Sequence, residues 1–290
     1  MTIRRTLTVQ DLAALRQNRI FTTPDGSDRL TPGETVSFNP DVVIEKYSGH
    51  FSGLIFCTMG AFSYSWSHFN TLDMDLKIGR YCSIAGNVTV FPGNHPLQFL
   101  TTSSCTGDIE LAPFRAAIED FGDTGFVPRY SPAPLAPAPV IGHDVWIGQD
   151  ATLARGITLG HGCAVGTGSV VTKSVPPYAL VAGNPARIIR MRFPDPMIEA
   201  LLASAWWRYA FPHFGAMRFD EPEQFLGELG ERIAAGTITP FESGIAAKDL
   251  FSSPPTPSPP PPPPPPPHLV RSSANRALRA LGLKKTRQTP

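Results

Sequence analysis

Aliphatic residues recur at every sixth position through the middle of the chain. They are, in chain order, Ile78, Ile84, Val90, Ile141, Ile147, Leu153, Leu159, Val165 and Val171. A period of six matches neither the 3.6-residue period of an α-helix nor the alternation of a simple strand. It is typical of a parallel β-helix, in which each hexapeptide forms one face of a triangular prism and three hexapeptides complete a coil. The pattern therefore predicts an all-β fold built on a parallel β-helix.

Small residues directly follow several of these aliphatic positions. They are Gly79, Ala85, Gly142, Gly148, Ala154, Gly160 and Gly166. We expect them at the corners of the prism, where the backbone bends and a bulky side chain would be costly. Because one coil cannot bury its own aliphatic residues, the coils must stack, and the stacked columns form the core. An ordinary sheet protein would show alternation and irregular turn spacing instead.

The repeats are interrupted once. Residues 78–95 make one full coil, the pattern stops over residues 96–140, and it resumes in register at Ile141. Prolines concentrate at the end of this interval and favour a stiff, extended return to the prism. Loops of this length are uncommon and are usually functional. We predict a β-helix over residues 36–190 with an inserted loop at 96–140; a disordered insertion is the alternative.

The chain outside the β-helix divides into four segments. Residues 1–35 form an N-terminal segment with a short helix that Thr8 can cap. Residues 191–245 have helical spacing and form a short C-terminal helical extension. Residues 246–267 are a proline-rich linker, whose nine consecutive prolines favour an extended polyproline II spacer. Residues 268–290 form a basic tail.

The charges are spread unevenly along the chain. The formal net charge is +1, but the tail carries six of the 25 Lys and Arg residues and no acid, which leaves 19 basic against 24 acidic residues elsewhere. This balance offers no basic face for nucleic acid. We favour a solvated end for the tail, and a weak contact with an anionic membrane or a partner is the alternative.

The four cysteines show no paired spacing. We expect them to be buried small residues in a reducing compartment, with no disulfide frame and no metal site. No stretch approaches the length of a transmembrane helix, and Arg4 and Arg5 are not followed by the apolar run of a secretory signal. The expected location is the cytoplasm.

Four segments carry a resemblance to a known family. They are IGRYCSIAGN (78–87), FPGNHP (91–96), the run from IGHDVWIGQD to AGNPARIIRMRF (141–193), and ALLASAWWRY (200–209). In order and spacing they resemble the hexapeptide-repeat acyltransferases, and more closely the xenobiotic acetyltransferase branch with the virginiamycin and type B chloramphenicol enzymes. The resemblance covers residues 60–215. It implies a left-handed β-helix, a homotrimer with active sites between subunits, and acetyl-CoA as the donor.

His95 is the candidate catalytic base. Transfer of an acetyl group to a hydroxyl needs a group that takes the hydroxyl proton, and neutral imidazole suits this task. His95 ends a regular coil and opens the long loop. The resemblance implies the same role, because the family's basic histidine opens this loop.

The resemblance also implies the residues that bind the donor. Trp146 matches the tryptophan beside the pantetheine arm, and Gly166 and Thr167 match small residues that let this arm approach the backbone. Four further residues match the positions that meet the nucleotide phosphates. They are Thr172, Lys173, Arg187 and Arg190.

The acceptor is less constrained. We expect a hydroxyl of a sugar or polysaccharide, with a streptogramin- or chloramphenicol-type antibiotic as the alternative. Aromatic residues and two histidines before residue 70 are candidates for acceptor contacts, although we favour a structural role for the aromatic residues. They are Tyr47, Phe62, Tyr64, Trp66 and Phe69, with His50 and His68.

Two other classes of function compete with a transferase. A β-helix metalloenzyme of the carbonic anhydrase type would need three converging histidines. His143 and His161 are 18 residues apart and should stack on adjacent coils, but no third histidine has ligand spacing and both fall at expected solvated corners. A silent scaffold is disfavoured by His95, Trp146 and Lys173.

Overall fold

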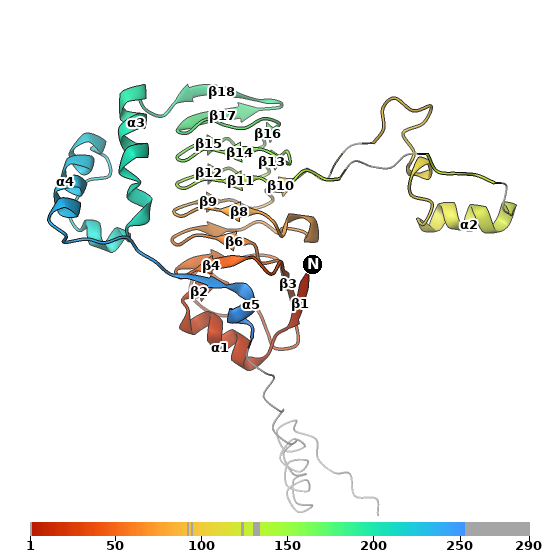
Figure 1. Cartoon of the computed structure of the whole chain (residues 1–290), viewed down its shortest axis with the longest axis horizontal. Coiled ribbons are helices and arrows are strands. Elements are labelled where there is room, and N and C mark those ends of the chain that lie inside the picture. The colour runs from red at the N-terminus through yellow and green to blue at the C-terminus, as the bar shows by residue number, and fades with distance from the viewer. Residues whose placement is uncertain (1, 92, 94, 123–124, 130–133, 253–290) are drawn as a thin grey trace, which may run out of the picture. The chain divides into compact units, whose positions relative to one another are not determined.

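The repeats form a parallel β-helix (Figure 1). The computed structural model describes residues 2–91, 93, 95–122, 125–129 and 134–252. The predicted basic tail and residues 253–267 of the predicted linker lie outside these residues. Within them, no helix is both long and apolar enough to cross a membrane.

Three sheets form the faces of the prism. The six-stranded sheet has the order β14 (Thr158–Leu159), β11 (Val140–Ile141), β8 (Lys77–Ile78), β6 (Thr58–Met59), β4 (Val43–Glu45) and β19 (Gly244–Ala246). The eight-stranded sheet has the order β18 (Ala186–Met191), β17 (Ala179–Gly183), β15 (Ala164–Val165), β12 (Trp146–Ile147), β9 (Ser83–Ile84), β7 (Tyr64–Ser65), β5 (Ser48–His50) and β2 (Ile20–Phe21). The three-stranded sheet has the order β10 (Thr89–Val90), β13 (Thr152–Leu153) and β16 (Val170–Val171). The pairs are parallel except β17–β18 and β4–β19, which lie at opposite ends.

The register continues across the interruption. Ile141 of β11 pairs with Ile78 of β8, and the next two strands of the coil pair in the same way. All nine aliphatic repeat positions are at most 4% exposed. Burial of each such side chain contributes about 1.5–3 kcal/mol, so the aliphatic column is the main stabilising feature of the prism.

The small residues serve a different purpose from the one we expected. A Cβ added to Gly79 would lie 2.4 Å from the carbonyl oxygen of Gly142, and one added to Gly160 would lie 2.5 Å from the nitrogen of Pro177. They are therefore required by the close approach of the next coil. The sharp bend comes two residues later, where Tyr81 has a φ of 63°. Other residues in this position with positive φ are Asn87, Asp144, Asp150, Gly156, Gly162 and Gly168.

The C-terminal part of the chain packs on one corner of the prism. It contains α3 (Asp195–Ser204), two 3₁₀ turns at Trp206–Arg208 and Phe211–Phe214, and α4 (Pro222–Ala234). The corner presents a column of rings, with Tyr47 and Phe62 stacked at 5.7 Å and Phe62 and Tyr81 4.9 Å apart. Rings from the C-terminal part cover this column, as in the contact of Tyr81 with Trp206 at 4.9 Å.

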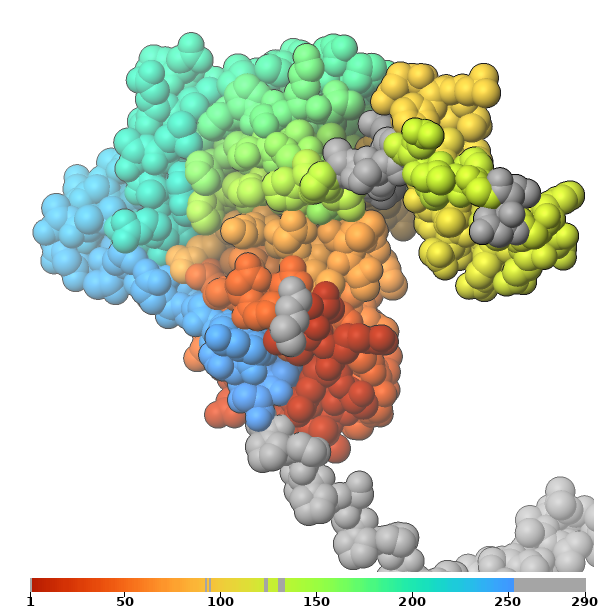
Figure 2. Space-filling view, turned by 45° about the vertical axis from the view of Figure 1, so that its right-hand side comes forward, coloured from red at the N-terminus to blue at the C-terminus, as the bar shows by residue number. Residues whose placement is uncertain are grey.

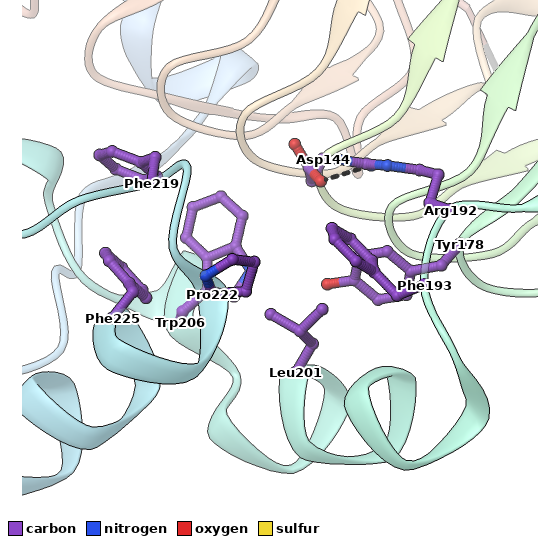
Figure 3. Close-up of a pocket in the computed structure, with 9 residues that line it drawn as sticks. All are labelled: Asp144, Tyr178, Arg192, Phe193, Leu201, Trp206, Phe219, Pro222 and Phe225. Carbon is purple, nitrogen blue, oxygen red and sulfur yellow. Dashed lines mark hydrogen bonds and ion pairs between the residues drawn. The ribbon is translucent and has the colours of Figure 1, made fainter.

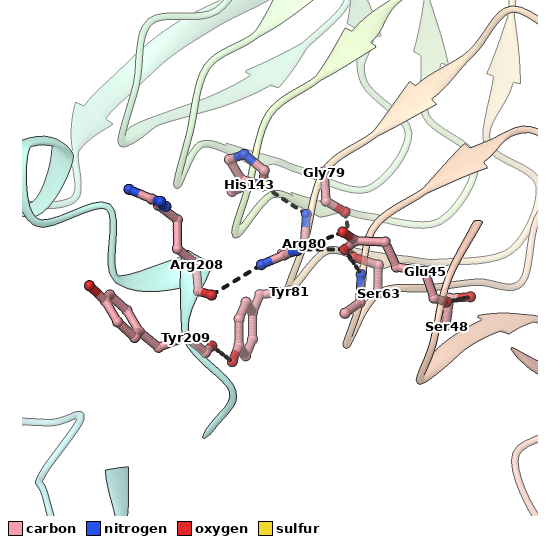
Figure 4. A network of polar contacts seen from close by, with 10 residues as sticks. Glu45, Ser48, Ser63, Gly79, Arg80, Tyr81, His143, Arg208 and Tyr209 are labelled. Carbon is pink, nitrogen blue, oxygen red and sulfur yellow. Dashed lines mark hydrogen bonds and ion pairs between the residues drawn. The ribbon is translucent and has the colours of Figure 1, made fainter. Parts of the chain in front are cut away.

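Polar contacts fix the same corner (Figure 4). The Arg80 guanidinium donates to both oxygens of Glu45 at 2.6 Å and to the carbonyl of Arg208 at 3.1 Å. The Tyr81 hydroxyl donates to the carbonyl of Tyr209 at 2.6 Å. Side chains of this corner thus bind backbone carbonyls of the C-terminal part, in addition to the contacts between rings.

The chain then returns to the first coils. α1 (Val9–Gln17) begins at Thr8, whose side chain accepts from the Asp11 amide, as the predicted cap requires. Beside it, β19 and α5 (Ala247–Leu250) add apolar side chains to the N-terminal core. Residues 246–252, which we assigned to the linker, therefore belong to the folded body. The eight-stranded sheet likewise begins earlier than residue 36, since β2 pairs with β5.

Part of the inserted segment, residues 96–139, stands apart from the coils (Figures 1 and 2), whereas Ala138 near its returning end is buried in their core. It contains a 3₁₀ turn at Ser104–Thr106 and α2 (Ala112–Phe121), and no residue of α2 is buried. We expected an irregular loop here, and the segment has a helix of its own. Its two ends lie at the corner between the three-stranded and six-stranded sheets, because it connects β10 to β11.

Candidate functional site

His95 lies just beyond the three-stranded sheet, five residues after the last aliphatic position of its coil. The side chain is exposed, and its Nδ1 is 2.8 Å from the carbonyl oxygen of Thr102. A carbonyl oxygen only accepts hydrogen bonds, so Nδ1 must carry the hydrogen in this contact. In the neutral form of the ring, Nε2 is then the nitrogen without a hydrogen, and it can accept a proton from a substrate.

Trp146 lies on the outer surface of the eight-stranded sheet. Its side chain is 48% exposed. The residues that pair with it on the adjacent strands are Ser83 and Ala164, which are both small. The indole ring therefore stands above a shallow surface to which an extended molecule has access.

Gly166 and Thr167 lie on the coil that follows Trp146. The Gly166 amide donates to the carbonyl of Val181 at 2.8 Å, so this amide is already used within the sheet. A Cβ added to Gly166 would lie 3.0 Å from the Cβ of Ala182. The contribution that Gly166 can make to a binding site is therefore the space left by its missing side chain. Thr167 is exposed.

Lys173 and Arg187 come together at one end of the prism. They line a cleft of about 420 Å³ between the chain after β16 and the β17–β18 hairpin. The other lining residues are Val171, Ser174, Val175, Pro176, Val181, Ala186 and Ile188. The charged side chains of this lining are both basic, which suits a polyanion such as a nucleotide phosphate. Thr172 and Arg190 are exposed nearby in sequence but are not part of the lining.

The predicted site residues are divided between two faces of one copy. His95 follows β10 of the three-stranded sheet, whereas the basic cleft lies between the chain after β16 of that sheet and β18 of the eight-stranded sheet, which carries Arg187. Trp146 is on β12 of the eight-stranded sheet. Since neighbouring faces of a prism point in different directions, a single copy does not bring His95 and Trp146 to opposite sides of one groove.

His143 and His161 stack on adjacent coils as predicted, but they are not at solvated corners. Their rings are 4.9 Å apart, and Trp207 covers both at 5.1 and 4.7 Å. Each Nδ1 accepts a backbone amide: His143 from Arg80 at 2.8 Å, and His161 from His143 at 2.9 Å. Burial lowers the pKa of His143 to about 4. Among the described residues, no three His, Cys, Asp or Glu side chains gather where they could hold a metal.

The candidates for acceptor contacts have different surroundings. His50 is buried against Phe56 at 4.7 Å, and burial lowers its pKa to about 3, so it is not available to an acceptor. Phe69 is also buried. Tyr64 and Trp66 remain exposed on the eight-stranded face, where Phe51 contacts both rings at 5.8 and 5.1 Å.

A second cavity of about 190 Å³ lies between the C-terminal part and the coils (Figure 3). It is bounded by the ion pair of Asp144 and Arg192 at 3.0 Å and by the rings of Tyr178 and Trp206. Burial raises the pKa of Asp144 and of Tyr178. The cavity contains none of the predicted site residues.

Comparison with known proteins agrees with the fold. Residues 138–173 match the family described as bacterial transferase hexapeptide (six repeats). A probable macrolide acetyltransferase from Lysinibacillus sphaericus is 35% identical over 175 residues, covering 56% of this chain and 83% of the relative. A chloramphenicol acetyltransferase from Klebsiella aerogenes is 34% identical, covering 59% of this chain and 78% of the relative.

A solved hexapeptide-repeat acetyltransferase from Vibrio cholerae O1 biovar eltor, complexed with acetyl coenzyme A, is 22% identical. The match covers 51% of this chain and 62% of that one, with a TM-score of 0.32. The family assignment rests on the sequence relatives, which match this chain over most of their own length. The chain belongs to the hexapeptide-repeat acetyltransferases, in the branch that contains the macrolide and chloramphenicol enzymes.

Proposed function

We propose that this protein is an acetyl-CoA-dependent O-acetyltransferase with His95 as its catalytic base. The observation that carries the proposal is the contact of His95 Nδ1 with the Thr102 carbonyl, which leaves Nε2 free to take a proton. The acceptor hydroxyl oxygen attacks the thioester carbonyl carbon while its proton passes to Nε2. The carbon–sulfur bond then breaks, and His95 returns the proton to the sulfur of CoA. Such a base contributes about 10²–10⁴-fold to the rate.

The donor lies along the left-handed β-helix in this proposal. Trp146 flanks the pantetheine arm, and Gly166 and Thr167 leave room for it beside the coil. Lys173 and Arg187 meet the nucleotide phosphates in the basic cleft, which supports this placement of the charged end of CoA. Thr172 and Arg190 add exposed polar groups at the same end of the prism. The expected compartment is the cytoplasm.

A homotrimer completes the site. His95 and Trp146 are on different faces of one copy, so a base from one subunit and a donor groove on its neighbour make one site. The inserted segment supports this arrangement because it presents large apolar side chains to solvent. Those more than 60% exposed are Leu97, Leu100, Phe121 and Val127. Sedimentation analysis of the purified protein tests the trimer, and a monomer at assay concentrations would contradict it.

The acceptor we propose is a hydroxyl of a sugar or polysaccharide. The exposed rings of Tyr64 and Trp66 support it, since aromatic faces pack well against sugar rings. Solved structures named galactoside acetyltransferase and maltose O-acetyltransferase share the repeat. An antibiotic is the second candidate, and it is favoured by the names of the relatives at 34–35% identity.

A thiol-release assay with acetyl-CoA separates these possibilities. The acceptor panel contains maltose, a galactoside, a capsular-type oligosaccharide, chloramphenicol, a macrolide and virginiamycin A. Saturable CoA release with one class, and mass spectrometry of the acetylated product, identifies the acceptor. Failure of every member to accept an acetyl group from a trimeric, folded protein would contradict the proposed activity. Zinc measured by elemental analysis tests the metalloenzyme alternative.

A further inference from the structure

The two ends of the inserted segment are held to the prism unequally. On the outgoing side, the last sheet hydrogen bond is from the Phe91 amide to Leu153, four residues before His95. On the returning side, the Ala138 amide donates to Asp75 at 2.8 Å, and the Gly156 amide donates to Pro137 at 2.8 Å. Among the described residues, the returning end therefore has more hydrogen bonds to the prism than the end that carries His95.

The two ends lie against each other. A Cβ placed on Gly93 would be 3.3 Å from Cδ2 of Leu135. Gly93 has a φ of 144°, a conformation that favours glycine. Leu135 thus packs next to the backbone of Gly93, two residues before His95. A shift of the returning end would therefore also shift the backbone that leads to His95.

One side chain joins the returning end to the rest of the corner. Arg155 follows β13, and its side chain is 9% exposed. Its Nε donates to the carbonyl of Ala136 at 2.5 Å, and its Nη2 donates to the carbonyl of Leu72 at 3.0 Å. The guanidinium also pairs with Asp73 and Asp75, each at 3.3 Å. A single planar group therefore contacts two backbone segments and two carboxylates.

The partners of Arg155 are themselves fixed. Asp73 is 2% exposed, and its carboxylate accepts the amide of Asn70, whose side chain caps the short turn at Thr71–Asp73. Asp75 accepts from Ala138 with one oxygen and pairs with Arg155 through the other. A lysine could not make this set of contacts, because its ammonium lacks the forked geometry of a guanidinium.

We propose that Arg155 is a positioning residue that sets the place of His95 through Ala136 and Leu135. The proposal rests on the function proposed above. His95 and Thr102 both belong to the inserted segment or its entrance, so their hydrogen bond moves with the segment and does not fix its position relative to the coils. Arg155 belongs to a coil, so its contacts do fix that position. Misplacement of a catalytic group by about 1 Å can cost about 10²-fold in rate.

The test compares Arg155→Met with Arg5→Met as a matched control. Arg5 pairs with the fully buried Asp11 at 3.0 Å in the N-terminal segment, so its loss also removes the cationic partner of a buried carboxylate. Both variants should melt at a lower temperature than the wild type. Arg155→Met should lower kcat by about 10–100-fold with less than a threefold change in the KM for acetyl-CoA. Arg5→Met should keep the wild-type kcat.

Two further variants sharpen the test. Arg155→Lys should not restore kcat, whereas guanidinium at non-denaturing concentrations should partly restore Arg155→Ala. If Arg155→Met fails to fold, Asp75→Asn removes one contact of the same group and should lower kcat by about threefold to tenfold. A wild-type kcat in a folded Arg155→Met or Asp75→Asn protein overturns the proposal.

Hydrogen exchange gives a readout that does not require turnover. In Arg155→Met, amides of residues 95–106 should exchange faster than in the wild type, and in Arg5→Met they should not. If the wild type transfers no acetyl group, the proposed function fails, and unchanged exchange in Arg155→Met would separately overturn the positioning role. If His95→Ala is inactive while Arg155→Met retains full kcat and wild-type exchange, only the positioning role is lost.

Discussion

The coils and the inserted segment are stabilised in opposite ways. In the coils, each aliphatic repeat residue is buried, and parallel strands bond each coil to the next. In the inserted segment, α2 has no buried residue, and the contacts to the prism that we describe gather at its returning end. The coils therefore carry stability, and the entrance of the segment carries the proposed base, His95, whose position depends on a few contacts. The predictions below test this division.

The largest effect we expect is on activity, from His95→Ala. Loss of the base should lower kcat by about 10²–10⁴-fold, because no other group takes the hydroxyl proton. The melting temperature should change by less than two degrees, since the side chain is exposed. Steady-state assays and thermal melts measure the two quantities. More than a few per cent residual activity in a folded trimer would remove His95 from the mechanism.

Ile147→Ala should have the opposite effect to His95→Ala, because its main result should be a loss of stability. Ile147 is completely buried in the column between neighbouring coils, and its truncation should cost about 2–5 kcal/mol of the free energy of unfolding. Leu100→Ala in the inserted segment is the matched control and should cost less than about 0.5 kcal/mol, because Leu100 is fully exposed. Denaturant melts measure both. Equal losses would show that the two regions share one core.

Acid should weaken the coils through their buried histidines. His50 and His143 have pKa values lowered to about 3 and about 4, whereas an unfolded histidine has a pKa near 6.5. The unfolded chain therefore binds protons first, and stability should fall as the pH drops from about 6.5 toward 4. Denaturant melts at several pH values measure this slope. His50→Leu should reduce the slope, and an unchanged slope in that variant would contradict the role of this histidine.

The smallest expected effect on folding comes from Phe121→Ser on α2. Phe121 is 83% exposed, so the change should alter the free energy of unfolding by less than about 0.5 kcal/mol. If a neighbouring subunit covers this residue, the same change should weaken the trimer several-fold in sedimentation experiments. A trimer of unchanged affinity would show that Phe121 faces solvent in the assembly as well.

The sequence predicts the coils better than their surroundings. The six-residue period follows from burial of one column, so Ile78 and Ile141 could be aligned across the interruption from the pattern alone. The stacking of His143 on His161 followed from the same spacing and is confirmed. Their burial could not be predicted, because Trp207 comes from a part of the chain that obeys no repeat.

Residues of the candidate site could be predicted only where the type of side chain itself indicates the chemistry. His95 has chemistry that a reader of the sequence can recognise. Its partner is the carbonyl of Thr102, and every residue has a carbonyl, so no residue type marks this contact. Arg155 is equally hidden, because its partners precede it by about 20 and 80 residues and depend on how the coils stack.

The register between β8 and β11 has a consequence for how such a protein can diverge. Because the coil that follows the interruption pairs with the coil before it as if nothing intervened, the prism imposes no particular length or sequence on what lies between them. The segment can be exchanged for another, provided that its two ends still meet beside Gly93 and Arg155. Under the proposed function, such an exchange would change the acceptor and leave the residues proposed to bind the donor in place.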